Sequence, residues 1–399
     1  MEIELAQASR GTTESPDPSW NRLPRGNRDR WEPGLVLLLC LASAAAFGVQ
    51  AASKERPLMY YEGDCPYYIS TALSLLNDGD IDLRNQLRGG LEVHGRQIAL
   101  GRGGQWYPKH PILMPIAALP FLAAFGMPGF VIFSVVLLAA FPVALMRLAR
   151  PFAPPAAAAG AAALLMAGTF LRRYDYNITP DLFAALLGAS GLLDLMRGRH
   201  LRGGVVLGIS AAAKPSNLFL LPFGLLYALA GQGRRGLLRC AAGATVPVIA
   251  LLLLNAALFG SPFVGSYDRN VLLRDGTLTV VSHMGQFDRN ALRGLAGELF
   301  DRERGLVPTS PVLWLALPGF ALMLRRHRRE AVLTLLLSEF YLLLFATYRY
   351  WDTTRYGNRF LILVVALASP PLALILEWLK ERARPTMRRL GGAPAPATS

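Results

Sequence analysis

The chain has 399 residues, of which 53% are hydrophobic, and its mean hydropathy is positive. This composition is too apolar for a soluble globular protein and predicts an integral membrane protein. The net charge of +14 would suit a nucleic-acid-binding protein only if the basic residues formed one surface stripe. They occur instead in short clusters between apolar runs, so no nucleic-acid partner is expected and the lipid bilayer is the expected environment.

Ten apolar runs are candidate membrane-spanning helices, because a hydrocarbon core about 30 Å thick needs roughly 20 apolar residues as helix. They lie near 34–52, 127–149, 156–171, 181–196, 203–214, 216–231, 240–259, 309–324, 331–347 and 360–379. Pro215 interrupts the runs around Lys214, which predicts a broken helix and allows about 8 to 12 spans. The expected fold is an all-α polytopic bundle over 32–380, with a disordered tail at 1–31 and a second tail at 381–399.

Arginines mark the sides of the membrane. Acid-poor basic clusters alternate along the chain, before residue 31, at 147–150, 197–202, 234–239 and 325–329, and after 379. By the positive-inside rule these segments and both termini are cytoplasmic, and the protein belongs in the inner cell membrane. Two long segments, 54–126 and 260–308, then lie outside, and long ordered loops usually carry function.

Two helices are expected inside the first outer segment. Cys65 to Asn77 has apolar residues at helical spacing with hydroxyl residues between them, which predicts an amphipathic helix at the membrane interface. Ile112 to Phe125 is apolar but too short to span comfortably, so it is expected to lie along the interface as well.

An acidic and aromatic cluster stands just outside the first span. It contains Glu62 and Asp64 as candidate catalytic carboxylates, with Tyr67 and Tyr68 as candidate substrate-binding rings. A carboxylate held at a helix start can act as a general base, and aromatic rings beside it can stack on sugars or exclude water. The structural alternative for Asp64 is a helix cap before Pro66.

A second cluster closes the same segment at Tyr107, Lys109 and His110. A lysine at headgroup depth suits a lipid phosphate, with His110 beside it and Tyr107 as a substrate-binding ring. The alternative is an aromatic belt with a lysine that reaches toward the headgroups. Five scattered histidines lack metal-ligand spacing, so no zinc site and no cofactor are predicted, and a divalent metal is left open.

Further charged residues lie near other expected helix ends. Arg173 and Asp181 join two spans on the outer face, where charges at membrane depth need partners, although Asp181 could instead cap a helix. Lys214 lies in the broken span, and Arg355 and Arg359 precede the last span. A guanidinium grips phosphate with two hydrogen bonds, while the alternative for these cations is interface anchoring.

Taken in order, these segments resemble the GT-C superfamily of integral membrane glycosyltransferases, which contains protein O-mannosyltransferases and lipid A aminoarabinose transferases. The resemblance covers about 34–378. It is carried by Glu62 to Tyr68, which resembles the acidic motif after the first span, by Tyr107 to Pro111, by Arg173 to Asp181, and by Leu207 to Lys214. Cys65 stands where relatives have a second acid beside Asp64, and His110 replaces the first proline of a Lys-Pro-Pro-like motif.

The resemblance implies transfer of one sugar, with inversion, from a polyprenyl-phosphate donor to an acceptor on the outer face. Asp64 would be the base, Glu62 a second catalytic carboxylate, and Lys109, His110, Arg355, Arg359 and Lys214 the binding residues for the donor phosphate. The acceptor would be an envelope glycan, a glycolipid or a protein. A transporter or flippase of lipid-linked sugars would share the hydropathy profile, but it would concentrate polar groups near the membrane midplane.

Overall fold

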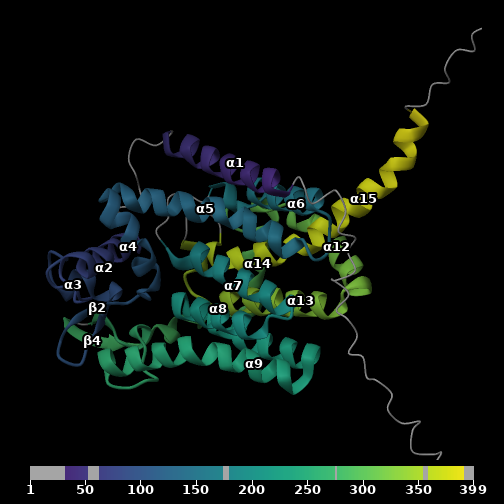
Figure 1. Ribbon diagram of the computed structural model, residues 1–399. Helices are drawn as coiled ribbons and strands as arrows, with labels where there is room; N and C mark the ends of the chain where they lie inside the picture. The colour runs from purple at the N-terminus through teal and green to yellow at the C-terminus, as the bar shows by residue number, and fades with distance from the viewer. Residues whose placement is uncertain (1–31, 53–62, 174–178, 275, 354–357, 391–399) are drawn as a thin grey trace, which may run out of the picture.

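The computed structural model describes residues 32–52, 63–173, 179–274, 276–353 and 358–390 (Figure 1). Glu62 and Arg355, two of the predicted site residues, lie outside these ranges, as does the predicted tail at 1–31. The helix nearest the C-terminus continues to Leu390, so part of the predicted tail at 381–399 is helical.

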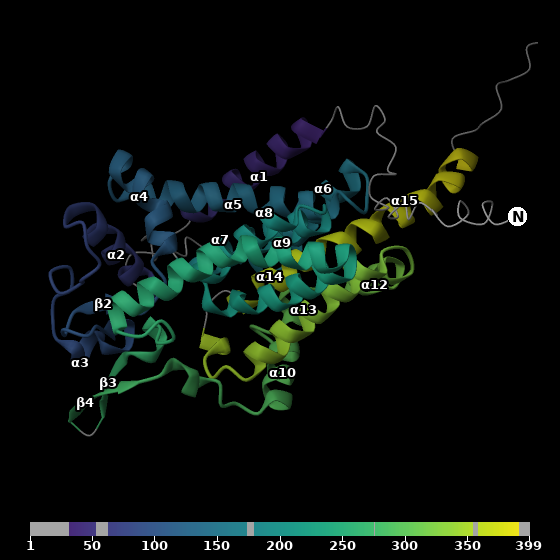
Figure 2. The same cartoon turned by 60° about the horizontal axis from the view of Figure 1, so that its bottom comes forward.

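All ten apolar runs are helical, and the resulting helices lie side by side in one bundle (Figures 1 and 2). The bundle consists of α1 (Glu32–Ala52), α5 (Pro128–Ala149), α6 (Pro155–Gly168), α7 (Pro180–Met196), α8 (His200–Ala213), α9 (Leu220–Phe259), α12 (Leu313–Arg326), α13 (Arg328–Ala346), α14 (Ile362–Leu367) and α15 (Ser369–Leu390). Short helical segments join them: η5 (Phe170–Arg173), η6 (Pro215–Phe219), α11 (Leu306–Thr309), η9 (Trp351–Thr353) and η10 (Arg359–Leu361).

Helix α9 contains two of the predicted spans, separated by a sharp break. Gln232 and Gly233 have non-helical backbone angles, with φ of +60° at Gly233, where glycine is favoured. A Cβ on Gly236 would lie 2.5 Å from the carbonyl oxygen of Ala228, although residues eight apart in a straight helix are separated by about 12 Å. The two halves of α9 therefore fold back on each other, as the sequence predicts for 216–231 and 240–259.

The predicted count of ten spans is not confirmed. Among the described residues, three helices are long and apolar enough to cross a membrane: Glu32–Val49, Pro128–Ala149 and Pro215–Phe259. The bent pair Arg359–Leu367 and Ser369–Ala383 would make a fourth. Helices α6, α8 and α12 have only 14 residues each, fewer than the roughly 20 that cross a bilayer unaided.

The centre of the bundle is built from α7 and α14, which are buried along most or all of their length. Small residues allow the close packing around them. A Cβ on Gly204 of α8 would lie 2.1 Å from the carbonyl oxygen of Cys240 in α9, so glycine is required where these helices cross. The ends of α7 and α8, and the start of α14, are thereby held at fixed positions relative to one another.

The two long segments predicted to lie outside meet at one end of the bundle. The first contains α2 (Cys65–Asn77), α3 (Leu91–His94), η4 (Gly95–Gln97), β1 (Ile98–Leu100), β2 (Trp106–Pro108) and α4 (Leu113–Phe125). The second contains η7 (Ser266–Asp268), β3 (Asn270–Arg274), β4 (Thr277–Val281), η8 (His283–Gln286) and α10 (Ala291–Phe300). The helix over Cys65–Asn77 has the predicted bounds, and Leu113–Phe125 starts one residue later than predicted.

A four-stranded antiparallel sheet, ordered β2-β1-β3-β4, joins the two segments through the pairing of Ala99 with Asn270. The expectation of an all-α fold is therefore wrong at this point. Strands of three to five residues are too short for a clear alternating pattern, so they leave no signal in the sequence. The pairing shows that both segments lie at the same end of the bundle, as the charge pattern predicts (Figure 2).

Candidate active site

Asp64 stands at the N-cap position of α2, but its carboxylate makes no capping hydrogen bond. Oδ2 instead accepts a hydrogen bond from Nη2 of Arg359 at 2.7 Å, and Oδ1 accepts one from Nε2 of Gln97 at 3.0 Å. Pro66, in the first turn, needs no partner for its nitrogen, which leaves the carboxylate available. The backbone of Asp64 thus occupies the N-cap position of α2. Its side chain instead contacts residues of a site that lies between 63–126, 260–308 and the helical bundle.

Arg359 is shared between two carboxylates. Its Nε lies 3.5 Å from Oδ2 of Asp181, and Oδ1 of Asp181 lies 2.7 Å from Nζ of Lys214. These residues come from the starts of η10 and α7 and from the extended residue between α8 and η6. Asp64, Arg359, Asp181 and Lys214 thus form a continuous row of alternating charges, which we call the ion-pair row.

Two aromatic rings shield the cationic end of this row. The Nζ of Lys214 lies 5.3 Å from the ring centroids of both Phe345 and Phe360, and the guanidinium carbon of Arg359 lies 5.3 Å from the Phe360 centroid. The two rings stack on each other at 5.0 Å. Cation–π contacts of this kind stabilise a charge that is largely removed from water.

A hydrogen-bonded group surrounds the other end, at Asp64. His110 Nε2 lies 2.8 Å from Gln97 Oε1 and 3.5 Å from Asp64 Oδ1, while His110 Nδ1 lies 3.0 Å from the hydroxyl of Tyr267. Tyr68 stacks on the His110 ring at 5.0 Å. Both ring nitrogens of His110 therefore have protein partners, and the imidazole is fixed in orientation beside the carboxylate.

The charge of Asp64 is set by these neighbours. Burial alone would raise the pKa of Asp64, but the His110 ring and the Arg359 guanidinium outweigh it and hold the pKa well below the ordinary value. Asp64 is therefore ionised at neutral pH. At neutral pH such a carboxylate can become a stronger base only when part of this positive charge is withdrawn.

Lys109 differs from the other cations of the site. Its side chain is only 8% exposed, so it does not reach outward to the headgroups as the anchoring alternative would require. Among the described residues no hydrogen bond or ion pair is formed by its ammonium group, which lies 5.9 Å from the ring centroid of Tyr267. Burial lowers the pKa of Lys109, and the Asp64 charge counteracts this only in part. The site therefore holds a buried cation that has no acidic partner among the residues that the structure describes.

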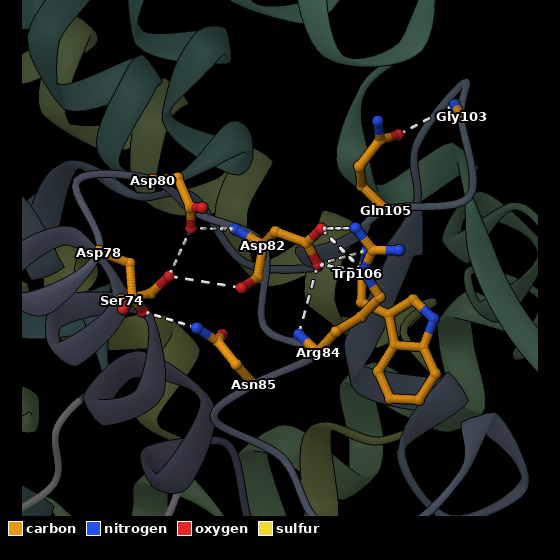
Figure 3. Close-up of polar contacts among 9 residues, drawn as sticks. All are labelled: Ser74, Asp78, Asp80, Asp82, Arg84, Asn85, Gly103, Gln105 and Trp106. Atoms are coloured by element: carbon orange, nitrogen blue, oxygen red, sulfur yellow. Dashed lines mark hydrogen bonds and ion pairs between the residues drawn. The ribbon is translucent and has the colours of Figure 1, made fainter.

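The acidic run at 78–85 braces the strand that leads to Lys109 (Figure 3). Asp80 accepts hydrogen bonds from the Ser74 hydroxyl at 2.9 Å and from the Asp82 amide at 3.0 Å. Asp82 accepts one from the backbone N–H of Trp106 at 3.2 Å and pairs with Arg84. These carboxylates tie the end of α2 to β2, so their role is to hold Trp106 to Pro108, and with them Lys109 and His110, in place.

Most of the predicted site residues come together. One cluster contains seven of them: Asp64, Tyr68, Lys109, His110, Asp181, Lys214 and Arg359. Tyr67 hydrogen-bonds to His94 at 3.0 Å, and its pKa is raised by burial and by the Asp64 charge, so it borders the cluster. Tyr107 packs against Phe259 instead, with ring centroids 5.9 Å apart, and Arg173 ends η5 with its side chain outside the described residues.

The sequence analysis does not identify four residues that contact the site: Gln97, Tyr267, Phe345 and Phe360. Gln97 is a single amide within a run of mixed character. It follows Gly95, which packs closely on β3, since a Cβ there would lie 2.5 Å from the Val271 carbonyl oxygen. Tyr267 lies in the second outer segment and reaches His110 only through the sheet. No spacing in the sequence relates either residue to Asp64.

Comparisons with known proteins support the fold. No protein-family model matches the chain, and no curated protein matches it in sequence. Two solved structures from Archaeoglobus fulgidus are similar: an oligosaccharyltransferase in the apo form, with a TM-score of 0.55, 12% identity and 95% of this chain covered, and the oligosaccharyltransferase AglB in complex with an inhibitory peptide and a dolichol-phosphate, with a TM-score of 0.54, 12% identity and 93% covered.

The chain spans about half the length of these structures, since the matches cover 54% and 53% of the other chains. At 12% identity, the likeness establishes a shared fold. The arrangement of the helices is therefore similar to that of these two oligosaccharyltransferase structures.

The lowered pKa of Asp64 predicts a pH-dependent effect of Asp64→Asn on stability. Because the native pKa lies below the unfolded value, the ion pair stabilises the fold above about pH 4, and this contribution is lost as the pH falls through the native pKa. Thermal unfolding in detergent should therefore show a deficit of about 1.5–3 kcal/mol for the variant at pH 7, which shrinks toward pH 3. A deficit that stays constant over this range would contradict the ion pair.

Proposed function

We propose that this protein is an integral membrane glycosyltransferase that moves a sugar from a polyprenyl-phosphate donor to an acceptor on the outer face of the membrane. The observation that carries the proposal is the cluster in which one carboxylate, Asp64, stands beside the cations Lys109 and Arg359 at one end of an apolar bundle. The fold supports it, because a similar structure is named an oligosaccharyltransferase and binds a dolichol-phosphate, itself a polyprenyl phosphate.

The reaction explains why several cations gather here. The acceptor oxygen attacks the anomeric carbon from the side opposite the phosphate, the bond from that carbon to the phosphate oxygen breaks, and its electron pair leaves with the polyprenyl phosphate. The sugar is transferred with inversion. The phosphate carries one negative charge as a diester and about two as the leaving monoester, so positive charge stabilises the transition state more than the ground state.

Lys109 is the cation that we assign first to this phosphate, because it is buried and no acid in the described part of the chain pairs with it. Arg359 and Lys214 supply further positive charge from the ion-pair row. His110 lies between Asp64 and Tyr267 and borders the same space, so its predicted contact with the phosphate remains part of the proposal. No step assigned to these residues requires a metal.

Asp64 becomes a base by a change of partners. While Arg359 contacts Asp64, the carboxylate binds protons weakly. When the donor phosphate draws the guanidinium toward itself, Asp64 loses positive charge and its pKa rises. The carboxylate then accepts the proton of the acceptor hydroxyl as the new glycosidic bond forms. Phosphate binding and activation of the base are thereby linked through one arginine.

We also propose the roles that the sequence analysis predicts for the other candidate residues. Glu62 is a second carboxylate and Arg355 a further phosphate ligand, while Tyr67, Tyr68, Tyr107, Arg173 and Asp181 contact substrate. The acceptor is an envelope glycan, a glycolipid or a protein. The membrane is the inner membrane, with both termini cytoplasmic, and the closer likeness to O-mannosyltransferases and aminoarabinose transferases stays a prediction.

A transporter or flippase of lipid-linked sugars is the competing function. Such proteins place their polar sites near the membrane midplane. Here Asp64, Asp181, Lys214 and Arg359 all lie at helix ends or starts. Transfer of a labelled sugar to an acceptor, compared with movement of intact labelled lipid across vesicles, separates the two functions.

Asp64→Asn is expected to lower sugar transfer by about 10²- to 10⁴-fold, because a positioned base is lost while the amide keeps the shape of the side chain. The assay follows a radiolabelled sugar from polyprenyl-phosphate donor to product with purified protein. Asp194→Asn is the matched control, since Asp194 is also buried and paired with arginines, at the other end of α7. Near-normal turnover of Asp64→Asn would reject the base.

Lys109→Ala is expected to weaken donor binding by roughly tenfold or more while acceptor binding changes little, because hydrogen bonds to charged groups contribute about 1.5–3 kcal/mol. A calorimetric titration with polyprenyl phosphate measures the affinity of each variant for the phosphate directly. Arg274→Ala removes an exposed cation of the same sheet and should bind as the wild type does. Equal affinity of Lys109→Ala and wild type would remove Lys109 from the phosphate site.

A further inference from the structure

The second outer segment contains a carboxyl group that the proposed reaction does not use. Glu298 of α10 is fully buried, its Oε1 accepts a hydrogen bond from Nδ2 of Asn358 at 2.6 Å, and its Oε2 has no hydrogen-bond partner among the described residues. Burial raises the pKa of Glu298 to about 8, although the Asn358 hydrogen bond counteracts it. Burial therefore favours the neutral form of this side chain, whose Oε1 accepts the hydrogen bond of Asn358 inside the protein.

Asn358 connects this carboxyl to the ion-pair row. It is fully buried, and its Oδ1 accepts a hydrogen bond from the backbone N–H of Phe360 at 3.2 Å, so it caps the short helix η10. Arg359 is the first residue of that helix. The amide of Asn358 thus holds Glu298 with one end and the backbone around Arg359 with the other.

Helix α10 is fixed against the same region at two further points. A Cβ on Gly294 would lie 1.8 Å from the carbonyl oxygen of Ala346, and a Cβ on Gly297 would lie 2.6 Å from the indole ring of Trp351. The helix therefore packs tightly on the end of α13 and on Trp351 of η9 (Figure 2). Glu298 therefore projects from a helix that is tightly packed against its neighbours.

We propose that Glu298 is a positioning residue: its hydrogen bond to Asn358 fixes the backbone from which Arg359 reaches Asp64 and Asp181. An aliphatic side chain could fill the same space, but it would leave the buried amide of Asn358 without a partner. The arrangement links the second outer segment to the charge that controls Asp64. Its effect on sugar transfer rests on the proposed function, whereas its effect on the backbone at Arg359 does not.

Hydrogen exchange at the amides of Phe360 and Leu361 tests the positioning itself. Glu298→Ala should speed exchange there by about tenfold or more, because a buried donor loses its acceptor, while amides in the middle of α13 keep the wild-type rate. Glu298→Gln retains an acceptor oxygen and should restore protection to within about twofold of wild type. Arg293→Ala, an exposed change on the same helix, is the control. Glu298→Leu replaces the alanine variant if that protein does not fold.

The kinetic arm measures KM for the polyprenyl-phosphate sugar and kcat with the same variants. We expect Glu298→Ala to raise KM and lower kcat, with Glu298→Gln close to wild type. Wild-type protection at Phe360 in the alanine or leucine variant, or equal loss in Glu298→Gln, would overturn the positioning role. Absence of transfer by every protein, wild type included, would instead refute the proposed function and leave the exchange result to decide the role of Glu298.

Discussion

The architecture of the site depends on one guanidinium that two carboxylates share. Asp64 and Asp181 come from opposite sides of the cluster and are largely withdrawn from water, and unpaired buried carboxylates would be costly. The guanidinium of Arg359 offsets the negative charge of both carboxylates, and the ammonium group of Lys214 pairs with Asp181 as well. The start of α2 is thereby fixed against the bundle, although 295 residues separate Asp64 from Arg359. The sheet, together with the hydrogen bonds of Asp80 and Asp82 to the end of α2 and to β2, then positions Lys109 beside Asp64.

This balance also suggests how the site responds to substrate. The ion-pair row contains two negative and two positive charges, so it is neutral as a unit, and the ammonium group of Lys109 adds one positive charge. Under the proposed function, the donor phosphate competes with Asp64 for Arg359, and this competition raises the pKa of Asp64 while the donor is bound. In the proposed mechanism, proton removal is therefore favoured when the donor is bound, and the hydrogen bond from Asn358 to Glu298 holds the backbone that carries Arg359.

Sequence reasoning identified the helices and the main charged residues, because long apolar runs and charges beside them are local signals. It placed the five charged residues of the cluster on one side of the membrane from the apolar runs and the arginine clusters between them: Asp64, Lys109, Asp181, Lys214 and Arg359. It missed the sheet, since its strands have three to five residues, and it missed Gln97, Tyr267 and Asn358, whose roles arise from contacts between distant segments. It also could not foresee that Arg359 holds Asp64 directly, because pairing between residues of opposite charge depends on three-dimensional packing.

The central claim is that the cluster around Asp64 binds a polyprenyl phosphate through Lys109 and Arg359. Photocrosslinking with a diazirine-bearing polyprenyl phosphate, followed by peptide mapping, tests it most directly. The account predicts that label falls on peptides containing 105–111 and 358–361, and that unlabelled polyprenyl phosphate suppresses it. Label confined to the opposite end of the bundle, around Asp194 and Arg202, or label insensitive to competition, would contradict it.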